Sequence, residues 1–218
     1  SGVSNNYLGK NIYLRFDVPC TISEGKNSIS ENYTILSCIS EDKEIKKIFL
    51  EVCETTFLNI SDEPSNGEIR DTTESIIDLF RNLPDAKRGF IGLWGELFLI
   101  VSSANQVKVL EAWHNHAEDK YDFYDHNEIL EVKCTTQGVR KHEFRHHQLL
   151  SKIEEHYVAS IKTKENYSKG LSVVDLYKKI LKNKLNLNLK DKLNKIYYKI
   201  VGKTPEEKLN EYKYDYDF

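Results

Sequence analysis

The chain has 218 residues, a length that allows one compact domain, or a domain with a small appended lobe, but not several domains. Hydrophobic residues make up 39% and charged residues 30%, which is enough apolar material for a core. No apolar run approaches the roughly 20 residues of a membrane-spanning helix, and the first residues lack the apolar stretch of a secretory signal. The four cysteines form no CxxC pair, which favours a reducing compartment. We therefore expect a cytoplasmic protein that has no membrane partner.

The formal net charge of −3 is unevenly distributed. Residues 1–138 contain 13 Lys and Arg against 23 Asp and Glu, whereas residues 139–218 contain 18 against 11. The basic carboxy-terminal part indicates a polyanionic partner that meets one side of the molecule. Lysine-rich helices with solvated faces would give the same counts, so charge alone leaves both interpretations open.

The beginning of the chain is predicted to be rich in β-structure. A loop is expected at 61–68 (SDEPSNGE), because it concentrates Ser, Asp, Pro, Asn and Gly. We therefore expect a β-rich N-terminal lobe, residues 1–68, and a core, residues 69–218. The segments dense in β-branched and aromatic residues are 11–18, 32–39 and 47–60.

After this loop the pattern alternates between helices and strands. The segment 71–83 places apolar residues on one helical stripe, and 88–104, the most apolar segment, predicts a buried helix. This alternation predicts an α/β (α+β) fold with a mixed sheet flanked by helices. Further strands are expected at 107–113, 120–125, 126–136 and 157–163, and further helices at 147–156, 172–185 and 189–202.

Two of the predicted strands carry the candidate chemistry. A tight turn centred on residues 126–127 would place Asp122 opposite Glu131, and alternation along the strand puts Lys133 on the same face as Glu131. Two close carboxylates raise each other's pKa unless a cation lies between them. Oxygen ligands in this arrangement suit Mg²⁺ or Mn²⁺. The opposite face of the strand would carry Leu130, Val132 and Cys134.

Glu96 is a third conspicuous carboxylate, because apolar residues surround it in FIGLWGELFLI. A buried charge is unfavourable unless it is paired or bound to a metal. Glu96 could equally lie at the polar edge of an amphipathic helix or form a salt bridge with a basic residue. The sequence around it leaves these possibilities open.

The segment 139–148 (VRKHEFRHHQ) follows the hairpin and is rich in basic residues. Such side chains are suited to holding phosphate groups, and Gln148 could orient a water molecule or the lysine. The candidate DNA-binding residues are Arg140, Lys141, His142 and Arg145. By contrast, His114-Asn115-His116 is contiguous, unlike the motif of HNH nucleases, and the histidines lack zinc-finger spacing. We expect neither an HNH nor a zinc site.

The order of these elements resembles the PD-(D/E)XK nuclease superfamily over residues 88–163. More narrowly, the chain resembles PD-(D/E)XK proteins encoded in prokaryotic restriction and defence neighbourhoods. One position departs from the motif, since Tyr121 precedes the acidic residue where the motif has Pro. The matching elements are GLWGELF, Trp113, Asp122-Phe123, Glu131-Val-Lys133, Arg140-x-His142 and Gln148-Leu149.

The resemblance implies a restriction-endonuclease-like fold and a Mg²⁺-dependent DNA endonuclease, in which Mn²⁺ substitutes for Mg²⁺. Asp122 and Glu131 would ligate the metal, and Glu96 would support it from the helix as a further ligand. Lys133 would position or activate the attacking water and stabilise negative charge on the phosphate. Gln148 would complete the catalytic site.

Three functions are compatible with the sequence. The leading one is a DNA endonuclease of a restriction or phage-defence system, acting as a homodimer or with ATPase or methyltransferase subunits. The second is a catalytically silent nuclease-fold module that binds nucleic acid or a partner protein. In the third, Glu131 and Lys133 form a surface ion pair on an edge strand, and leucine-rich helices bind partners in an assembly.

Overall fold

The computed structural model of the chain describes residues 6–9, 11–81, 90–115, 119, 121–126, 128–142 and 155–216. The chain folds as two compact units, Ser1–Leu83 and Pro84–Phe218. The helix at Asn66–Arg81, which begins within the predicted loop at 61–68, belongs to the first unit. No helix in the described part combines the length and the apolar character that crossing a membrane requires.

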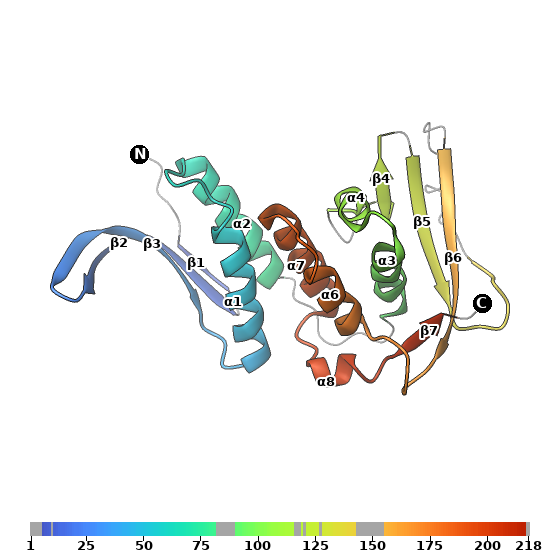
Figure 1. Cartoon of the computed structure of the whole chain (residues 1–218). Coiled ribbons are helices and arrows are strands. Elements are labelled where there is room, and N and C mark those ends of the chain that lie inside the picture. Colours follow the sequence, from blue (N-terminus) through green and yellow to red (C-terminus); the bar gives the residue numbers. More distant parts are fainter. Residues whose placement is uncertain are drawn as a thin grey trace. The chain divides into compact units, whose positions relative to one another are not determined.

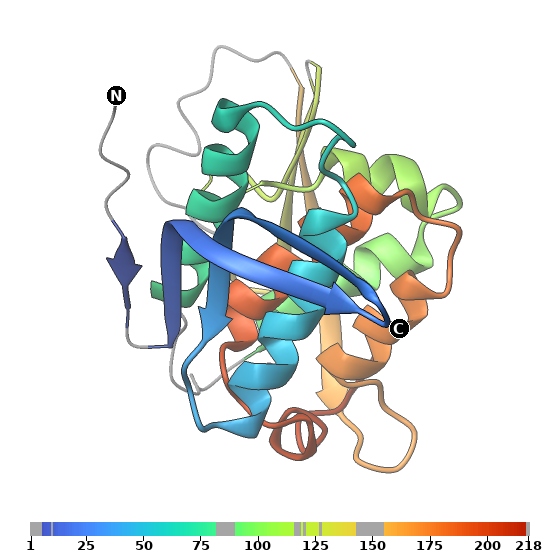
Figure 2. The same ribbon diagram turned by 90° about the vertical axis from the view of Figure 1, so that its left-hand side faces the viewer.

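The first unit contains an antiparallel sheet with the strand order β1-β2-β3 and two helices on one face of it (Figures 1 and 2). Its strands include the predicted segments 11–18 and 32–39, which are confirmed. The core is formed by Ile12 and Leu14 of the sheet together with apolar residues of both helices. The elements are β1 (Tyr7–Leu8), β2 (Ile12–Glu24), β3 (Asn27–Cys38), α1 (Lys43–Phe57) and α2 (Asn66–Arg81).

The expectation of a strand at 47–60 was wrong, because this segment lies largely within helix α1. The side chain of Asp42 accepts hydrogen bonds from the main-chain N–H groups of Glu44 and Ile45 and so caps the start of the helix. Ile48 and Val52, four residues apart, are buried on one side of it. A high content of β-branched residues is a weaker guide than this helical spacing.

The second unit contains a four-stranded mixed sheet with the order β4-β5-β6-β7. The central pair, β5 and β6, is parallel, and the two outer pairs are antiparallel. This arrangement confirms the predicted mixed α/β fold. The strands are β4 (Phe123–Asp125), β5 (Glu128–Thr135), β6 (Glu155–Glu165) and β7 (Tyr214–Tyr216).

Helices cover this sheet, with α3 and α4 next to the strands and α6 and α7 packed against those two helices (Figure 1). The predicted buried helix at 88–104 is confirmed as α3, whose Leu97 and Ile100 are fully buried. The predicted helices at 172–185 and 189–202 are confirmed as α6 and α7. The helices are α3 (Ile91–Ser102), α4 (Gln106–Ala112), α6 (Val173–Leu181), α7 (Leu187–Val201) and α8 (Glu206–Leu209).

The expectation of a strand at 107–113 was also wrong, because this segment forms α4. The Asn105 side chain accepts a hydrogen bond from the main-chain N–H of Lys108 and starts the helix, and Leu110 is its buried residue. A short apolar segment fits both the helical and the strand period. The helix cap and packing against neighbouring elements decide between them.

Candidate active site

The β4–β5 hairpin has the predicted register. Phe123 lies opposite Leu130, and Asp125 lies opposite Glu128, so the turn is centred on residues 126–127. The predicted division of faces also holds. Helix α3 lies against Val132 and Cys134, whereas the Glu131 and Lys133 side chains meet each other on the opposite face.

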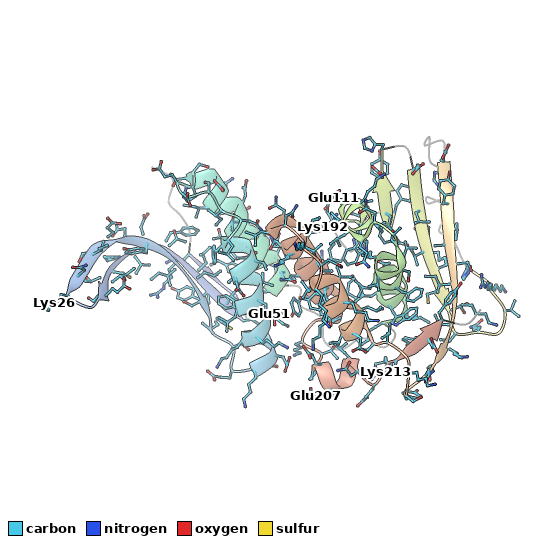
Figure 3. The ribbon with its side chains drawn as sticks, viewed as in Figure 1. Lys26, Glu51, Glu111, Lys192, Glu207 and Lys213 are labelled. Carbon is cyan, nitrogen blue, oxygen red and sulfur yellow. The ribbon has the colours of Figure 1, made fainter. Side chains whose placement is uncertain are left out.

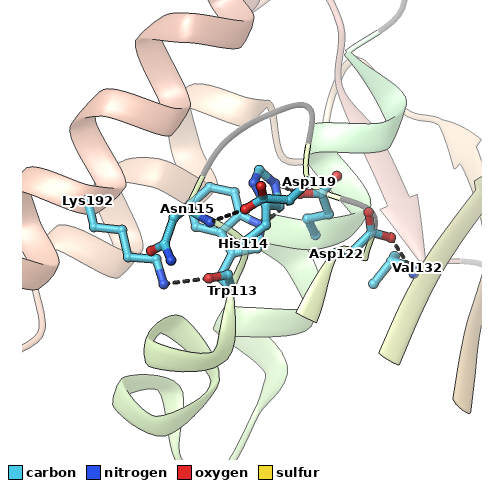
Figure 4. Close-up of polar contacts among 8 residues, drawn as sticks. Trp113, His114, Asn115, Asp119, Asp122, Val132 and Lys192 are labelled. Atoms are coloured by element: carbon cyan, nitrogen blue, oxygen red, sulfur yellow. Dashed lines mark hydrogen bonds and ion pairs between the residues drawn. The ribbon is translucent and has the colours of Figure 1, made fainter. Parts of the chain in front are cut away.

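Asp122 lies immediately before β4, at the point where the hairpin strands begin to pair. Its Oδ2 accepts a hydrogen bond of 2.7 Å from the main-chain N–H of Val132 (Figure 4). If β4 began earlier, a main-chain carbonyl of that strand would accept the hydrogen bond from Val132. Here the Asp122 carboxylate accepts it instead. Burial raises the pKa of Asp122 to about 7, helped by the charges of Glu96 and Glu131 and opposed by the Val132 hydrogen bond and by Lys133.

Glu131 and Lys133 form an ion pair on β5, with 2.6 Å between Lys133 Nζ and Glu131 Oε1. Their side chains are only 10% and 24% exposed, and β5 is an inner strand of the sheet. The interpretation of this pair as a surface contact on an edge strand is therefore wrong. A buried pair next to Asp122 is the arrangement expected of a functional site.

Glu96, on helix α3, lies close enough to Asp122 for its charge to raise the pKa of that residue. Its Oε2 accepts a 2.7 Å hydrogen bond from the indole Nε1 of Trp113 and lies 3.1 Å from Nε2 of His114. The side chain is 13% exposed, so Glu96 is largely shielded from solvent and lies beside a basic residue, His114. Its negative charge, which contributes to the raised pKa of Asp122, faces the Trp113 N–H and a ring nitrogen of His114.

His114 is a site residue that sequence reasoning missed. Its ring contacts Glu96, its main-chain N–H donates a 2.9 Å hydrogen bond to the carbonyl of Asp122, and its side chain is 7% exposed. The histidine belongs to the contiguous string His114-Asn115-His116, which is not the motif of HNH nucleases. No pattern in the sequence pairs it with a helix that precedes it by 12 residues or more.

Residues 139–142, the described part of the basic segment, contact strand β6. Arg140 Nη1 donates to the carbonyl oxygen of Ser160 at 3.2 Å, and His142 Nε2 lies 2.7 Å from Ser160 Oγ. Ser160 is the β6 partner of Lys133, so His142 and Lys133 flank the same position of the sheet. Lys141 is exposed. Arg145 and Gln148, which the sequence also marks, lie outside the described residues.

The donor set fits a hard divalent cation. Mg²⁺ binds through one or two carboxylates and completes its shell with water and substrate oxygens. Asp122 and Glu131 supply two carboxylates. The pKa of Asp122 is raised mainly by burial and further by the charges of Glu96 and Glu131, and a bound cation would oppose these effects. Within the described residues, no group of three or more His, Cys, Asp and Glu side chains is arranged so that it could hold a metal ion, so the two carboxylates would need water and substrate oxygens to complete the shell.

A comparison with protein families gives an independent assignment. The family model described as "Putative PD-(D/E)XK family member, (DUF4420)" matches residues 5–217. No curated protein and no solved structure matches the chain significantly. The matched range includes the hairpin with Asp122, Glu131 and Lys133 and the helix with Glu96. The chain therefore belongs to this nuclease-like PD-(D/E)XK family.

Proposed function

We propose that the protein is a Mg²⁺-dependent DNA endonuclease of a prokaryotic restriction or phage-defence system, with Mn²⁺ able to replace Mg²⁺. The observation that carries this proposal is the convergence of Asp122, Glu131 and Lys133 on the β4–β5 hairpin, next to the buried carboxylate of Glu96. Membership of the PD-(D/E)XK family supports the same class of chemistry.

Each side chain has a role that follows from its contacts. Asp122 and Glu131 would hold the metal, which when bound relieves negative charge on the phosphate and acidifies water. Lys133, held 2.6 Å from Glu131, would orient the attacking water and stabilise charge that develops on the phosphate. Glu96, fixed by Trp113 and His114, would support the cation with a further negative charge.

The substrate assignment rests on charge and position. Arg140 and His142 lie along β6 beside Lys133, where a phosphate backbone that enters the site would pass. Lys141 in the same segment is exposed, and residues 139–218 as a whole are basic. Cationic side chains next to a two-carboxylate site favour a polyanion with a scissile phosphodiester.

A plasmid-cleavage assay tests the proposal. Supercoiled plasmid is incubated with wild type, Lys133→Ala and the control Lys164→Ala, each with Mg²⁺, Mn²⁺ or EDTA. Lys164 is an exposed lysine on β6 that lies further along the neighbouring strand. We expect metal-dependent nicking by wild type and the control, at least a hundredfold reduced in Lys133→Ala, in line with the loss of one charge-stabilising group.

The outcomes separate the alternatives. Equal cutting by wild type and Lys133→Ala would assign the activity to a contaminant. No cutting, together with Mn²⁺ binding that is lost in Asp122→Ala, would indicate a nuclease-fold module that binds without cutting. No cutting and no Mn²⁺ binding would overturn the proposed function.

A further inference from the structure

Lys192 is a partly buried amine through which helix α7 contacts the segment that leads into the candidate active site. Its Nζ donates a 2.8 Å hydrogen bond to the carbonyl oxygen of Glu111, and both residues are labelled in Figure 3. A second hydrogen bond goes to the carbonyl oxygen of Trp113 (Figure 4). The two partners lie about 80 residues earlier in the chain. Both acceptors belong to the end of α4, whose last carbonyl groups have no partner within the helix.

The environment of this amine is unusual for a lysine. Burial lowers the pKa of Lys192 to about 8, although the neighbouring carboxylates of Asp119 and Glu111 act in the opposite direction. A side chain that served only to fill space at this position would be apolar, since desolvating an amine is unfavourable. The carboxylates of Asp119 and Glu111 favour a cation here, and the two carbonyl groups at the end of α4 accept its hydrogen bonds.

The segment that Lys192 holds continues directly into the site. Trp113, whose carbonyl accepts from Lys192, donates its indole N–H to Glu96. The next residue, His114, contacts the same carboxylate and donates its main-chain N–H to the carbonyl of Asp122. Trp113 therefore accepts from Lys192 through its carbonyl, and Trp113 and His114 together contact the Glu96 carboxylate and the main chain of Asp122.

We propose that Lys192 is a positioning residue of the candidate site, which fixes the Trp113–His114 segment and thereby the placement of Glu96 and Asp122. It acts through this segment. The part of the inference that concerns metal binding rests on the proposed function. The part that concerns the position of Trp113 does not, because it can be measured without metal.

The two tryptophans provide a direct readout in the metal-free protein. Both indole N–H groups donate 2.7 Å hydrogen bonds, Trp113 to Glu96 and Trp94 to the carbonyl of Leu171. In a ¹⁵N–¹H correlation spectrum, Lys192→Met should shift the Trp113 indole signal and leave that of Trp94 in place. A Trp94→Phe variant assigns the signals. The matched control is Lys195→Met, which removes a lysine paired with Asp191 on the same helix.

The second readout is Mn²⁺ affinity by calorimetry. Removing residues that orient metal ligands typically weakens metal binding by 10–100-fold. We expect a loss of at least tenfold in Lys192→Met, little change in Lys195→Met, and substantial recovery in Lys192→Arg, which retains donors to the two carbonyl groups. If Lys192→Met yields no folded protein, Lys192→Gln is compared in the same way.

Each result tests a different part of the inference. An unchanged Trp113 signal in folded Lys192→Met would overturn the inference. A shifted signal with wild-type Mn²⁺ affinity would overturn the positioning role. If wild type itself binds no Mn²⁺, the proposed function fails, and the Trp113 signal alone then shows whether Lys192 fixes the segment.

Discussion

The pKa of Asp122 is raised by some of its neighbours and lowered by others. Its carboxyl group is stabilised in the charged form by the N–H of Val132 and by Lys133. Burial and the charges of Glu96 and Glu131 act more strongly in the other direction and raise its pKa to about 7. Without a metal, folding therefore favours the protonated form of this group.

This shift predicts a pH dependence of stability. Between pH 4 and pH 7 the native state retains a proton on Asp122 that the unfolded chain has lost, so the free energy of unfolding should fall as pH rises. The slope from this group is at most about 1.4 kcal/mol per pH unit. Asp122→Asn should remove the contribution, because asparagine does not titrate.

Urea unfolding at pH 5.0 and pH 7.5 measures this dependence in the metal-free protein. Tryptophan fluorescence is a suitable signal, since Trp94 and Trp113 both lie in the second unit. Glu207→Gln, an exposed position on α8, serves as the control and should behave like wild type. An identical pH dependence in Asp122→Asn and wild type would contradict the assignment.

At the scale of elements, the approach of α3 to β5 sets where Glu96 lies. Gly95 permits this approach, because a Cβ atom there would lie 3.0 Å from the Cβ of Cys134 and 3.2 Å from a methyl group of Val132. Glu96 is the next residue along the helix. A change at Gly95 therefore moves a site carboxylate as well as a packing contact.

Gly95→Ala should destabilise the second unit by about 1–3 kcal/mol, the usual effect of overpacking. Gly92→Ala in the same helix is the matched control, because a Cβ atom there meets nothing within 4 Å. It should be neutral or stabilising by up to about 1 kcal/mol, since alanine favours helix over glycine. Thermal unfolding followed by tryptophan fluorescence compares them, and equal effects of the two substitutions would disprove the packing argument.

At the scale of the whole molecule, the separation of charge along the sequence predicts how a nucleic acid would bind. If the basic part, residues 139–218, contacts five or six phosphates, the logarithm of affinity should fall with the logarithm of salt concentration with a slope of about −5. Arg140→Ala should reduce the magnitude of this slope by about one. Fluorescence anisotropy with a labelled duplex at several salt concentrations measures both, and a flat salt response would exclude backbone contacts by this part.

The sequence by itself determined the hairpin and the buried helix. A two-residue turn between strands leaves one register, and alternation then assigns Glu131 and Lys133 to one face, so local chain geometry is sufficient. The apolar content of α3 likewise predicts burial around Glu96. The sequence pattern predicted secondary structure less well in the segments that form α1 and α4, because β-branched residues occur in both helices and strands. In these segments the capping residues Asp42 and Asn105 start a helix.

Only the tertiary structure decided how Glu96 is held. Its partners, Trp113 and His114, lie 17 and 18 residues away, and Lys192, which donates a hydrogen bond to the carbonyl of Trp113, lies a further 79 residues beyond Trp113. No periodicity relates positions on different elements, so their meeting depends on how α3, α4 and α7 pack. The carboxylates that do the proposed chemistry can be identified from local pattern, whereas the groups that orient them are brought close by long-range packing.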